Sequence, residues 1–407
     1  MRKRWASLAI ISAASLVGAA CGSDGGDDNP TTAATTASSP SVETRGVTDT
    51  SITVGGLTVI EGPGFSWGDT CTGAQVVFDK VNATGGVAGR KIDFSECIDD
   101  KLDATQNAAG ARKLVDEDKV FAVVPGQSLA FSGSSYLEKT NTPYFGWGTN
   151  PYFCGPEQGF GFNGCTAPDA FLAWNKLITL AIPSVKTVAI QGLDIEAGKQ
   201  AVQALAAGAE ANGLDVVFQD SSMPLQVTNY TPFVQKILAA DPDHVIVATA
   251  DAISMIAALK GAGYEGTTTN AATYDPGILQ NEAAVAALDG QYVDIQFQPF
   301  ESVDDPAVEQ FKADVAKYGP ADQPLTQQLG QGYASALLFV AILEEVGEDL
   351  TYDNFYKVAN GGGFCWDGDG FVGQICYPEG HTEYANCEAM VMVQDGEFKP
   401  VEPITCA

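Results

Sequence analysis

Basic residues and histidine are scarce in this sequence. Lysine and arginine together number 21 against 51 aspartates and glutamates, and the formal net charge is −30. A surface this acidic repels nucleic acid and anionic lipid headgroups, so we expect neither as a partner. The only histidines are His244 and His381, and no H-E-x-x-H segment occurs. With so few groups for acid–base or metal chemistry, we do not expect an enzyme.

Long hydrophobic runs are also missing at the start of the chain. The apolar run over residues 8–17 follows a basic start and is shorter than the roughly 20 residues of a membrane-spanning helix. Small residues then precede Cys21, which is the layout of a signal peptide and resembles a bacterial lipobox. We expect residues 1–21 to be a lipoprotein signal peptide with Cys21 lipidated. An ordinary signal peptide with an incidental cysteine is the alternative.

The segment that follows has almost no large apolar residues. Residues 22–48 are dominated by Gly, Ser, Thr, Ala, Asp and Pro, a composition that cannot bury a core. We therefore expect a disordered tether that holds the folded part off the membrane. Together with Cys21, this predicts an extracytoplasmic protein anchored to the cell membrane by lipid.

C-x-x-C pairs are absent, although the chain has nine cysteines. Without Cys21 the number is even, which in an exported chain favours disulfides over metal binding. A zinc site is the alternative, but the missing C-x-x-C spacing and the two histidines disfavour it. On the order of a hundred connectivities exist, and the clustering along the chain suggests sequential neighbours: Cys71–Cys97, Cys154–Cys165, Cys365–Cys376 and Cys387–Cys406.

What the sequence does contain, from residue 51 onward, is an alternation of strand and helix patterns. Near-continuous apolar strands separated by amphipathic helices indicate parallel sheets covered on both faces. The pattern restarts after Pro183, so two doubly wound lobes are expected, with a Cys-rich C-terminal segment. Strands are expected near 52–57, 91–94, 120–124, 187–190, 215–218, 244–249, 267–272 and 389–393, and helices near 73–81, 105–116, 197–212, 230–239, 252–262, 306–318, 332–345 and 352–359.

Several segments resemble one family, the branched-chain amino acid binding proteins among the type I periplasmic binding proteins of ABC importers. The resemblance rests on Val54–Leu57, on the N-x-x-G-G-x-x-G pattern of Asn82–Ile92, on Gly148–Pro151 and on the helix pattern of Gly332–Gly347. It implies an α/β fold of two doubly wound parallel-sheet lobes joined by a hinge. The expected boundaries are residues 49–172 and 299–378 for lobe 1, and residues 173–298 and 379–407 for lobe 2.

The same resemblance implies ligand-binding residues. Trp67 matches an aromatic residue that touches the ligand, although it could instead pack in the lobe core. Ser128 matches a serine that binds the ligand carboxylate, although a plain helix N-cap would look the same. The loop of Trp147, Gly148 and Thr149 would complete the carboxylate clamp.

In the second lobe the resemblance is weaker. Tyr274 and Asp275 fall where the family holds the ligand's ammonium group, with Asp275 as the carboxylate and Tyr274 as a cation–π face. The tyrosine that the family often has after the first strand of this lobe is missing from residues 191–198. The carboxylate half of an amino-acid site is therefore expected to be present and the ammonium half to be eroded.

The function that the resemblance implies is capture of a small amino acid or a related carboxylate or amide, and its delivery to a membrane permease. We expect a monomer that needs no cofactor and no metal. The alternative is a ligand-binding sensory module that acts through a separate membrane partner.

Overall fold

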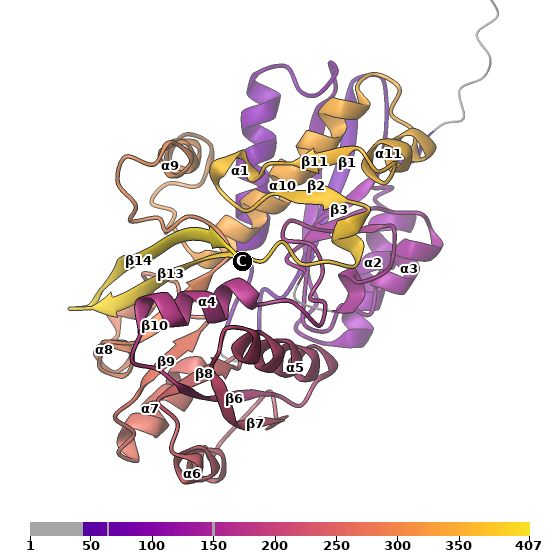
Figure 1. Cartoon of the computed structure of the whole chain (residues 1–407). Coiled ribbons are helices and arrows are strands. Elements are labelled where there is room, and N and C mark those ends of the chain that lie inside the picture. The colour runs from indigo at the N-terminus through magenta and orange to yellow at the C-terminus, as the bar shows by residue number, and fades with distance from the viewer. Residues whose placement is uncertain (1–43, 63–64, 149–150) are drawn as a thin grey trace, which may run out of the picture. The chain divides into compact units, whose positions relative to one another are not determined.

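The computed structural model describes residues 44–62, 65–148 and 151–407. The expected signal peptide, Cys21 and most of the tether therefore lie outside the described residues, and so does Thr149. The described residues belong to one compact unit. Its strands gather into two large sheets and one small one (Figure 1).

The first large sheet is wholly parallel, in the order β2-β1-β3-β4-β5. Every residue of β3 is buried, as expected of a strand covered on both faces. The strands are β1 (Ser51–Thr58), β2 (Lys91–Asp99), β3 (Ala122–Gln127), β4 (Tyr144–Gly146) and β5 (Gly159–Gly161). The helices of this lobe are α1 (Asp69–Ala83), α2 (Ala104–Asp116), α3 (Ser134–Lys139), α9 (Pro306–Tyr318), α10 (Gln327–Val346) and α11 (Tyr352–Ala359).

The second large sheet has seven strands in the order β14-β13-β10-β9-β8-β6-β7. Its strands are β6 (Thr187–Leu193), β7 (Asp215–Met223), β8 (His244–Ala248), β9 (Thr267–Asn270), β10 (Tyr292–Ile295), β13 (Cys387–Gln394) and β14 (Glu397–Cys406). The first five are parallel, while β13 and β14 join as antiparallel strands at one edge. The sequence pattern indicated β13 but not β14, whose two prolines weaken its strand signal.

Alternate residues of the second sheet pack against different helices, as the period of a strand requires. Val188 and Ile190 of β6 join the core of α4 (Leu172–Ala181) and α5 (Glu196–Ala211). Ala189 between them joins the core that includes residues of α6 (Thr231–Ala240) and α7 (Ala252–Gly261). Helix α8 (Glu282–Leu288) packs on α7. Both faces of the sheet are therefore covered, which confirms the doubly wound α/β class.

Helix α10 is the longest apolar helix among the described residues. By length and composition it could cross a membrane, but 78% of its apolar window is buried inside the fold. It packs closely on α1 because glycines stand at the contact: a Cβ on Gly332 would lie 1.8 Å from the carbonyl oxygen of Thr70, and one on Gly73 would lie 2.1 Å from that of Leu329. This helix is the core of the first lobe.

The described residues contain four disulfides, and they are the pairs that the clustering of cysteines suggested. Cys71–Cys97 ties α1 to β2, and Cys154–Cys165 closes the segment around β5. Cys365–Cys376 joins the small hairpin of β11 (Phe364–Trp366) and β12 (Ile375–Tyr377), and Cys387–Cys406 joins β13 to β14. The Cys-rich C-terminal segment is thus held covalently at each of its two hairpins.

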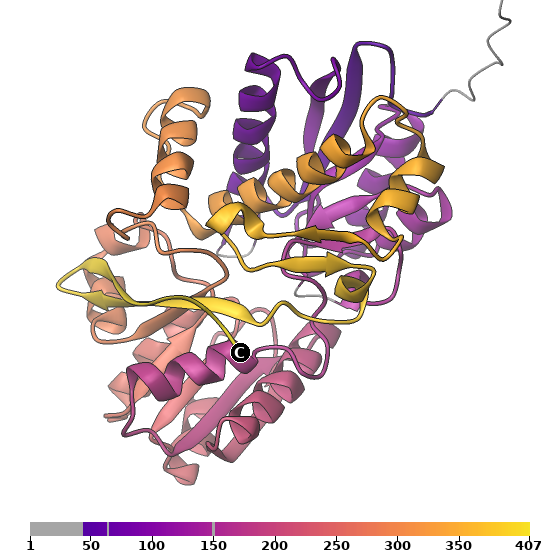
Figure 2. The same ribbon diagram turned by 45° about the horizontal axis from the view of Figure 1, so that its top comes forward.

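The chain passes between the two large sheets after β5, after β10 and after β12. Figures 1 and 2 show the last passage, where the yellow C-terminal residues run from β11 and β12 into the second lobe. An isolated bridge of Gly164 with Tyr384 joins the first passage to the last, and a bridge of Phe297 with Val372 joins the second passage to the segment between β11 and β12. These segments are the hinge of the fold.

A buried polar network lies at the hinge. Asn163 donates to the hydroxyl of Tyr384 at 3.0 Å, and this hydroxyl donates to Glu388 at 2.8 Å. Asp294 and Glu388 are both fully buried and hydrogen-bonded to each other. Burial raises the pKa of each carboxyl above its usual value, so the pair retains a proton that lies between two acceptor oxygens.

The network continues into the first lobe through glutamines. Gln296 donates to Asp294 at 3.3 Å and accepts from Gln331 at 3.3 Å. Gln331 in turn accepts a hydrogen bond of 2.6 Å from Gln127 at the end of β3. Side chains of both lobes are therefore joined through one continuous set of buried hydrogen bonds.

The carboxyl pair predicts a pH dependence of stability. Because the folded pKa is raised, the folded state holds a proton that the unfolded chain releases above the usual glutamate value of 4.5. The stability that this proton confers is present at low pH and is lost as the pH rises. Glu388→Gln should therefore gain stability relative to the parent protein between about pH 5 and pH 8, measured by urea unfolding at each pH. Glu383→Gln, which alters an exposed side chain, is the control, and its stability relative to the parent protein should be the same at every pH. Equal pH profiles of stability for the parent protein and Glu388→Gln would contradict the assignment of the shared proton to this pair.

The C-terminal disulfide predicts a local effect. Replacing Cys387 and Cys406 by serine should lower the free energy of unfolding by about 2–4 kcal/mol, because the unfolded chain gains loop freedom. The backbone amides of β14 should also exchange faster with deuterium, since this edge strand pairs only with β13 among the described strands. Replacing Cys365 and Cys376 is the matched control, and it should leave β14 exchange unchanged. Unaltered exchange in the first variant would rule out the disulfide as the clamp on this strand.

Candidate functional site

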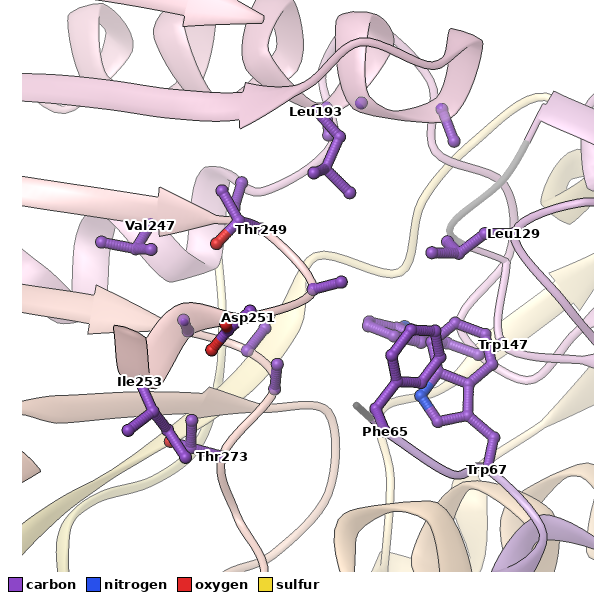
Figure 3. Close-up of a pocket in the computed structure, with 18 of the residues that line it drawn as sticks. Phe65, Trp67, Leu129, Trp147, Leu193, Val247, Thr249, Asp251, Ile253 and Thr273 are labelled. Atoms are coloured by element: carbon purple, nitrogen blue, oxygen red, sulfur yellow. The ribbon is translucent and has the colours of Figure 1, made fainter. Parts of the chain in front are cut away.

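A cavity of about 300 Å³ lies between the two lobes. The first lobe contributes the loop before α1 and the loops after β3 and β4. The second lobe contributes the carboxyl ends of β6, β8 and β9 and the first turns of α5 and α7. Figure 3 shows Phe65, Trp67, Leu129 and Trp147 across the cavity from Leu193, Thr249, Asp251 and Thr273. This is the place where doubly wound folds bind ligands.

The lining is largely apolar and rich in aromatic rings. Three of the chain's five tryptophans line it, together with two phenylalanines. The aromatic members are Phe65, Trp67, Trp147, Phe171 and Trp174, and aliphatic side chains such as Leu129, Leu193, Ile195, Val247 and Ile253 fill the space between them. Such walls favour a ligand with an apolar body.

The charged groups of the cavity are all of one sign among the described residues. Asp251 and Asp275 line it, and no described lysine, arginine or histidine does. Burial raises the pKa of Asp275 above its usual value, and the charge of nearby Asp69 adds to the rise. An anionic ligand would therefore meet carboxylates and no cationic side chain.

Four buried polar atoms of the lining have no hydrogen-bond partner among the described residues. They are the indole nitrogens of Trp147 and Trp174 and the hydroxyl oxygens of Thr249 and Thr273. Buried polar groups are rarely left unpaired in folded proteins. Because they lie around one cavity, we infer that a bound ligand supplies their hydrogen-bond partners.

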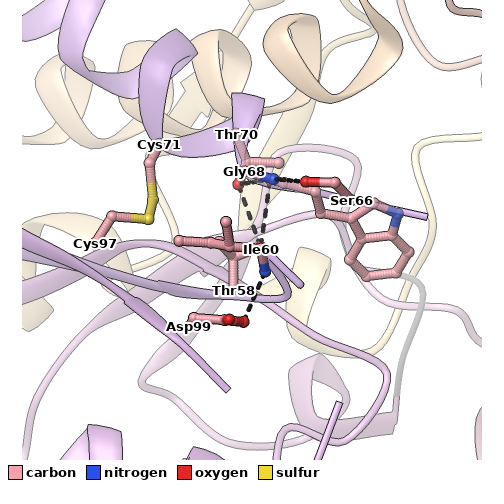
Figure 4. Close-up of a disulfide and its surroundings, with 9 residues drawn as sticks. Thr58, Ile60, Ser66, Gly68, Thr70, Cys71, Cys97 and Asp99 are labelled. Carbon is pink, nitrogen blue, oxygen red and sulfur yellow. Dashed lines mark hydrogen bonds between the residues drawn. A yellow bond between two sulfur atoms is a disulfide. The ribbon is translucent and has the colours of Figure 1, made fainter. Parts of the chain in front are cut away.

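Trp67 is held by the loop between β1 and α1. Its backbone N–H donates to Val59 at 2.7 Å, and its carbonyl accepts the hydroxyl of Thr70 at 2.7 Å. At the other end of the loop, Asp99 accepts the N–H groups of Ile60 and Glu61 at 2.8 and 3.2 Å. Figure 4 shows the hydrogen bond between Asp99 and Ile60 near the Cys71–Cys97 disulfide, which fixes the start of α1 against β2. The loop is thus tied down at both ends.

Asp99 is ionised in this arrangement. Burial works to raise the pKa of its carboxyl, but the N–H groups of Ile60, Lys101 and Glu61 outweigh burial and hold the pKa below its usual value. The carboxylate therefore accepts charge-assisted hydrogen bonds, which are the stronger kind.

The two carboxylates of the second lobe at the cavity, Asp251 and Asp275, lie at the start of a helix and after the end of a strand. Asp251 caps α7 by accepting the N–H of Ser254 at 3.1 Å, and it also accepts the hydroxyl of Tyr230 at 2.7 Å. Asp275 accepts the N–H of Gly277 at 2.7 Å through one of its oxygens. Both carboxylates are fixed by local turns, so they keep their positions at the cavity.

The structure places the residues expected from the resemblance in two groups. Trp67, Trp147 and Asp275 line the cavity. Ser128, Gly148 and Tyr274 are buried and do not line it. Thr149 lies outside the described residues.

The second group makes hydrogen bonds within the protein. The hydroxyl of Ser128 is hydrogen-bonded to the buried carboxyl of Asp100. The N–H of Gly148 donates to Asn163 at 3.0 Å. The hydroxyl of Tyr274 donates to Glu301 at 2.5 Å and accepts the N–H of Phe300 at 2.7 Å.

Sequence reasoning missed Phe171, Trp174, Thr249 and Asp251 as lining residues. The last two stand just after β8, and the carboxyl end of a parallel strand was the signal that could have found them. Trp174 lies within α4, a helix that the sequence pattern did not indicate. Phe65 also lines the cavity, whereas Phe131 and Phe145 are core residues.

The histidines lie away from the cavity lining. His244 is fully buried between the hydroxyls of Thr267 and Thr269, and burial lowers its pKa to about 3. His381 is held by Gly159 and Asn360, and burial lowers its pKa to about 4. Residues 64–68 match the G-x-S-x-G pattern of hydrolases. However, the hydroxyl of Ser66 accepts the N–H of Gly68, and neither histidine faces it from the cavity lining.

Residues 51–397 match the protein family described as "Periplasmic binding protein". No curated protein matches the sequence. A fatty acid ABC transporter substrate-binding protein from Thermomonospora curvata has a similar structure, with a TM-score of 0.73, 18% identity, and coverage of 90% of this chain and 95% of that chain.

Two further structures are similar over most of the chain. A solute-binding protein of an ABC transporter from R. palustris, in complex with benzoate, has a TM-score of 0.69 and 15% identity, with coverage of 88% and 98%. A "possible leucine/isoleucine/valine-binding protein" from Rhodopirellula baltica has a TM-score of 0.71 and 15% identity, with coverage of 86% and 96%. At these identities the likeness concerns the fold.

The anchoring of the Trp67 loop can be tested at Asp99. Asp99→Asn removes the negative charge that strengthens the hydrogen bonds from the N–H groups of Ile60 and Glu61. The variant should therefore be less stable than the parent protein by about 1–2 kcal/mol. Deuterium exchange of residues 59–68 should speed up, measured by mass spectrometry. Asp93→Asn, on an exposed position of the same strand, is the control. If both variants exchange alike in this loop, Asp99 does not hold it.

Proposed function

The chain belongs to the periplasmic binding protein family, and we propose that it is the extracytoplasmic solute-binding subunit of an ABC importer. It captures a small organic solute in the cavity between its lobes and delivers it to a membrane permease. The observation that carries this proposal is the cavity itself, which is lined from both lobes by apolar walls and by four unpartnered polar atoms.

Closure of two lobes about a hinge explains how such a cavity works. A solute that contacts both lobes stabilises the closed arrangement, because only that arrangement satisfies both sets of contacts. We propose residues 49–172 and 299–378 as the first lobe, and residues 173–298 and 379–407 as the second. The permease would bind the closed conformation.

For the ligand contacts we propose Trp67 and Trp147 from the first lobe and Asp275 from the second. Ser128, Gly148 and Tyr274 then act behind the cavity wall, where their hydrogen bonds hold the loops that carry the contact residues. Thr149 stays a proposal from the sequence alone. The starting set of ligands is a small amino acid or a related carboxylate or amide with an apolar body.

Residues 1–21, with Cys21 as the lipid attachment point, and the tether of residues 22–48 would place the lobes outside the cytoplasmic membrane. This arrangement keeps the protein near its permease.

Ligand capture can be detected from the position of the tryptophans. A true ligand should change the intrinsic fluorescence of the purified full chain, because Trp67, Trp147 and Trp174 line the cavity. The same ligand at about 100 times its dissociation constant should add about 2.7 kcal/mol of stability. We would screen amino acids, carboxylic acids, amides and amines by thermal unfolding and then by fluorescence.

The control for this experiment is Trp366→Phe. Trp366 is buried in the β11–β12 hairpin and does not line the cavity, so this variant should keep the ligand-induced change, while Trp67→Phe and Trp147→Phe should reduce it. A ligand that stabilises the chain but leaves the fluorescence of these tryptophans unaltered would place binding elsewhere. Stabilisation by no compound of any class would refute solute capture from this set.

A further inference from the structure

We infer that the solute held between the lobes is a small apolar amine, bound as a cation between the aromatic wall of the first lobe and the carboxylates of Asp251 and Asp275. This inference rests on the proposed function and names its substrate class. It differs from the amino acid or carboxylate that the sequence resemblance implies.

The first observation concerns the groups that would hold a ligand carboxylate. A clamp in the first lobe needs free donors, and its expected donors include the hydroxyl of Ser128 and the N–H of Gly148. The first is hydrogen-bonded to Asp100 and the second donates to Asn163 at 3.0 Å. Asp100 is itself fully buried and also accepts from Asn107 at 2.7 Å. The protein's own carboxyl therefore occupies the Ser128 donor.

The second observation concerns charge. Asp251 and Asp275 line the cavity without any basic side chain among the described lining residues. Asp275 has no ion-pair partner among the described residues, and the charge of Asp69 acts on it unfavourably. A partly buried carboxylate beside a like charge is costly unless a cation compensates it. A ligand cation supplies that compensation, whereas a ligand carboxylate adds a third negative charge.

The third observation is independent of charge. Thr249 and Thr273 are 6% and 2% exposed, and their hydroxyl oxygens have no partner among the described residues. They stand on the same wall as Asp251, as Figure 3 shows. A hydroxyl oxygen can accept a hydrogen bond from an ammonium N–H, so these two groups complete the coordination of a protonated amine.

The aromatic wall of the first lobe also favours a positively charged ligand. Phe65 and Trp67 lie with ring centroids 5.5 Å apart, and Trp147 stands beside them in Figure 3. The faces of aromatic rings attract cations and repel anions, and tryptophan is the strongest of them. An apolar body packed on these rings would place its ammonium group towards the acids across the cavity.

The unpaired indole N–H groups of Trp147 and Trp174 need an acceptor. A neutral oxygen on the ligand, as in a hydroxyl or an ether, would satisfy one of them without adding charge. The start of α5, where no side chain caps the helix, is the feature that most favours a ligand carboxylate instead. The experiment therefore has to separate an ammonium group from a carboxylate on the same apolar body.

Two head-group series make this separation. The first compares 3-methylbutylamine, leucine and 4-methylpentanoate, and the second compares 2-phenylethylamine, phenylalanine and 3-phenylpropanoate. Within each series the body is constant and only the charged group changes. Calorimetric titration of the full chain should give the tightest binding for the amine, at least about tenfold over the acid of the same series.

The variant that tests the assigned carboxylate is Asp275→Asn, which keeps shape and removes charge. It should weaken amine binding at least about tenfold and leave the binding of the matching neutral alcohol unchanged. Asp215→Asn, an exposed position at the start of β7, is the matched control and should alter neither. The fold of each variant is checked by its unfolding temperature.

The outcomes divide cleanly. Amine binding that Asp275→Asn weakens supports the inference. Tighter binding of the acid or the amino acid in either series overturns the inference but leaves solute capture intact. Binding of none of the six compounds overturns it too, and the broader screen then decides separately whether the proposed function fails with it.

Discussion

The fold depends on the buried carboxyl pair of Asp294 and Glu388, because this pair stands where the chain passes between the lobes. Two ionised carboxylates without water would repel each other strongly, so the pair is stable only while it shares a proton. Tyr384 and Gln296 hold the outer oxygens, and through them the pair is connected to Asn163 on one side and to Gln331 and Gln127 on the other. The relative position of the lobes is thus defined by hydrogen bonds with directional requirements, in addition to apolar packing that has none.

This network reaches the cavity through Asn163. Its amide nitrogen donates to Tyr384, and its amide oxygen accepts the N–H of Gly148, the residue next to Trp147. A change at the hinge therefore has a direct route to the aromatic wall. The loop of Trp67 has a separate support in Asp99 and the Cys71–Cys97 disulfide. The two aromatic residues of this wall are consequently positioned by different parts of the first lobe, one of which responds to the hinge.

The sequence predicted the strands and helices whose apolar period is strong, such as β8 and α9, and the cysteine pairs, because neighbouring cysteines fall on adjacent elements. It did not predict β10 or β14, which are short or proline-containing and are stabilised by their neighbours in the sheet. At the site, Trp67, Trp147 and Asp275 could be placed because they follow recognisable motifs. The role of Ser128 could not be judged, since it depends on Asp100, which lies 28 positions earlier and meets it only in the folded lobe. Trp174 was beyond prediction because nothing local distinguishes a cavity tryptophan from a core one.

The amine that we infer as ligand would reverse the polarity of the site that the sequence resemblance implies. The sequence suggested that the carboxylate half was present and the ammonium half eroded, and this judgement weighed only the types of residue at each position. In the folded protein, a hydrogen-bond donor can bind a ligand carboxylate only if it has no internal partner. A carboxylate favours a cationic ligand only if no cation of the protein compensates its charge. Ser128 and Gly148 have internal partners, whereas Asp275 faces the cavity with one oxygen turned to Gly277 and no cation among the described residues. The inferred amine specificity would thus keep the fold and change the charge of the ligand, because the buried carboxyl of Asp100 takes the hydrogen bond of Ser128 that a ligand carboxylate would otherwise accept.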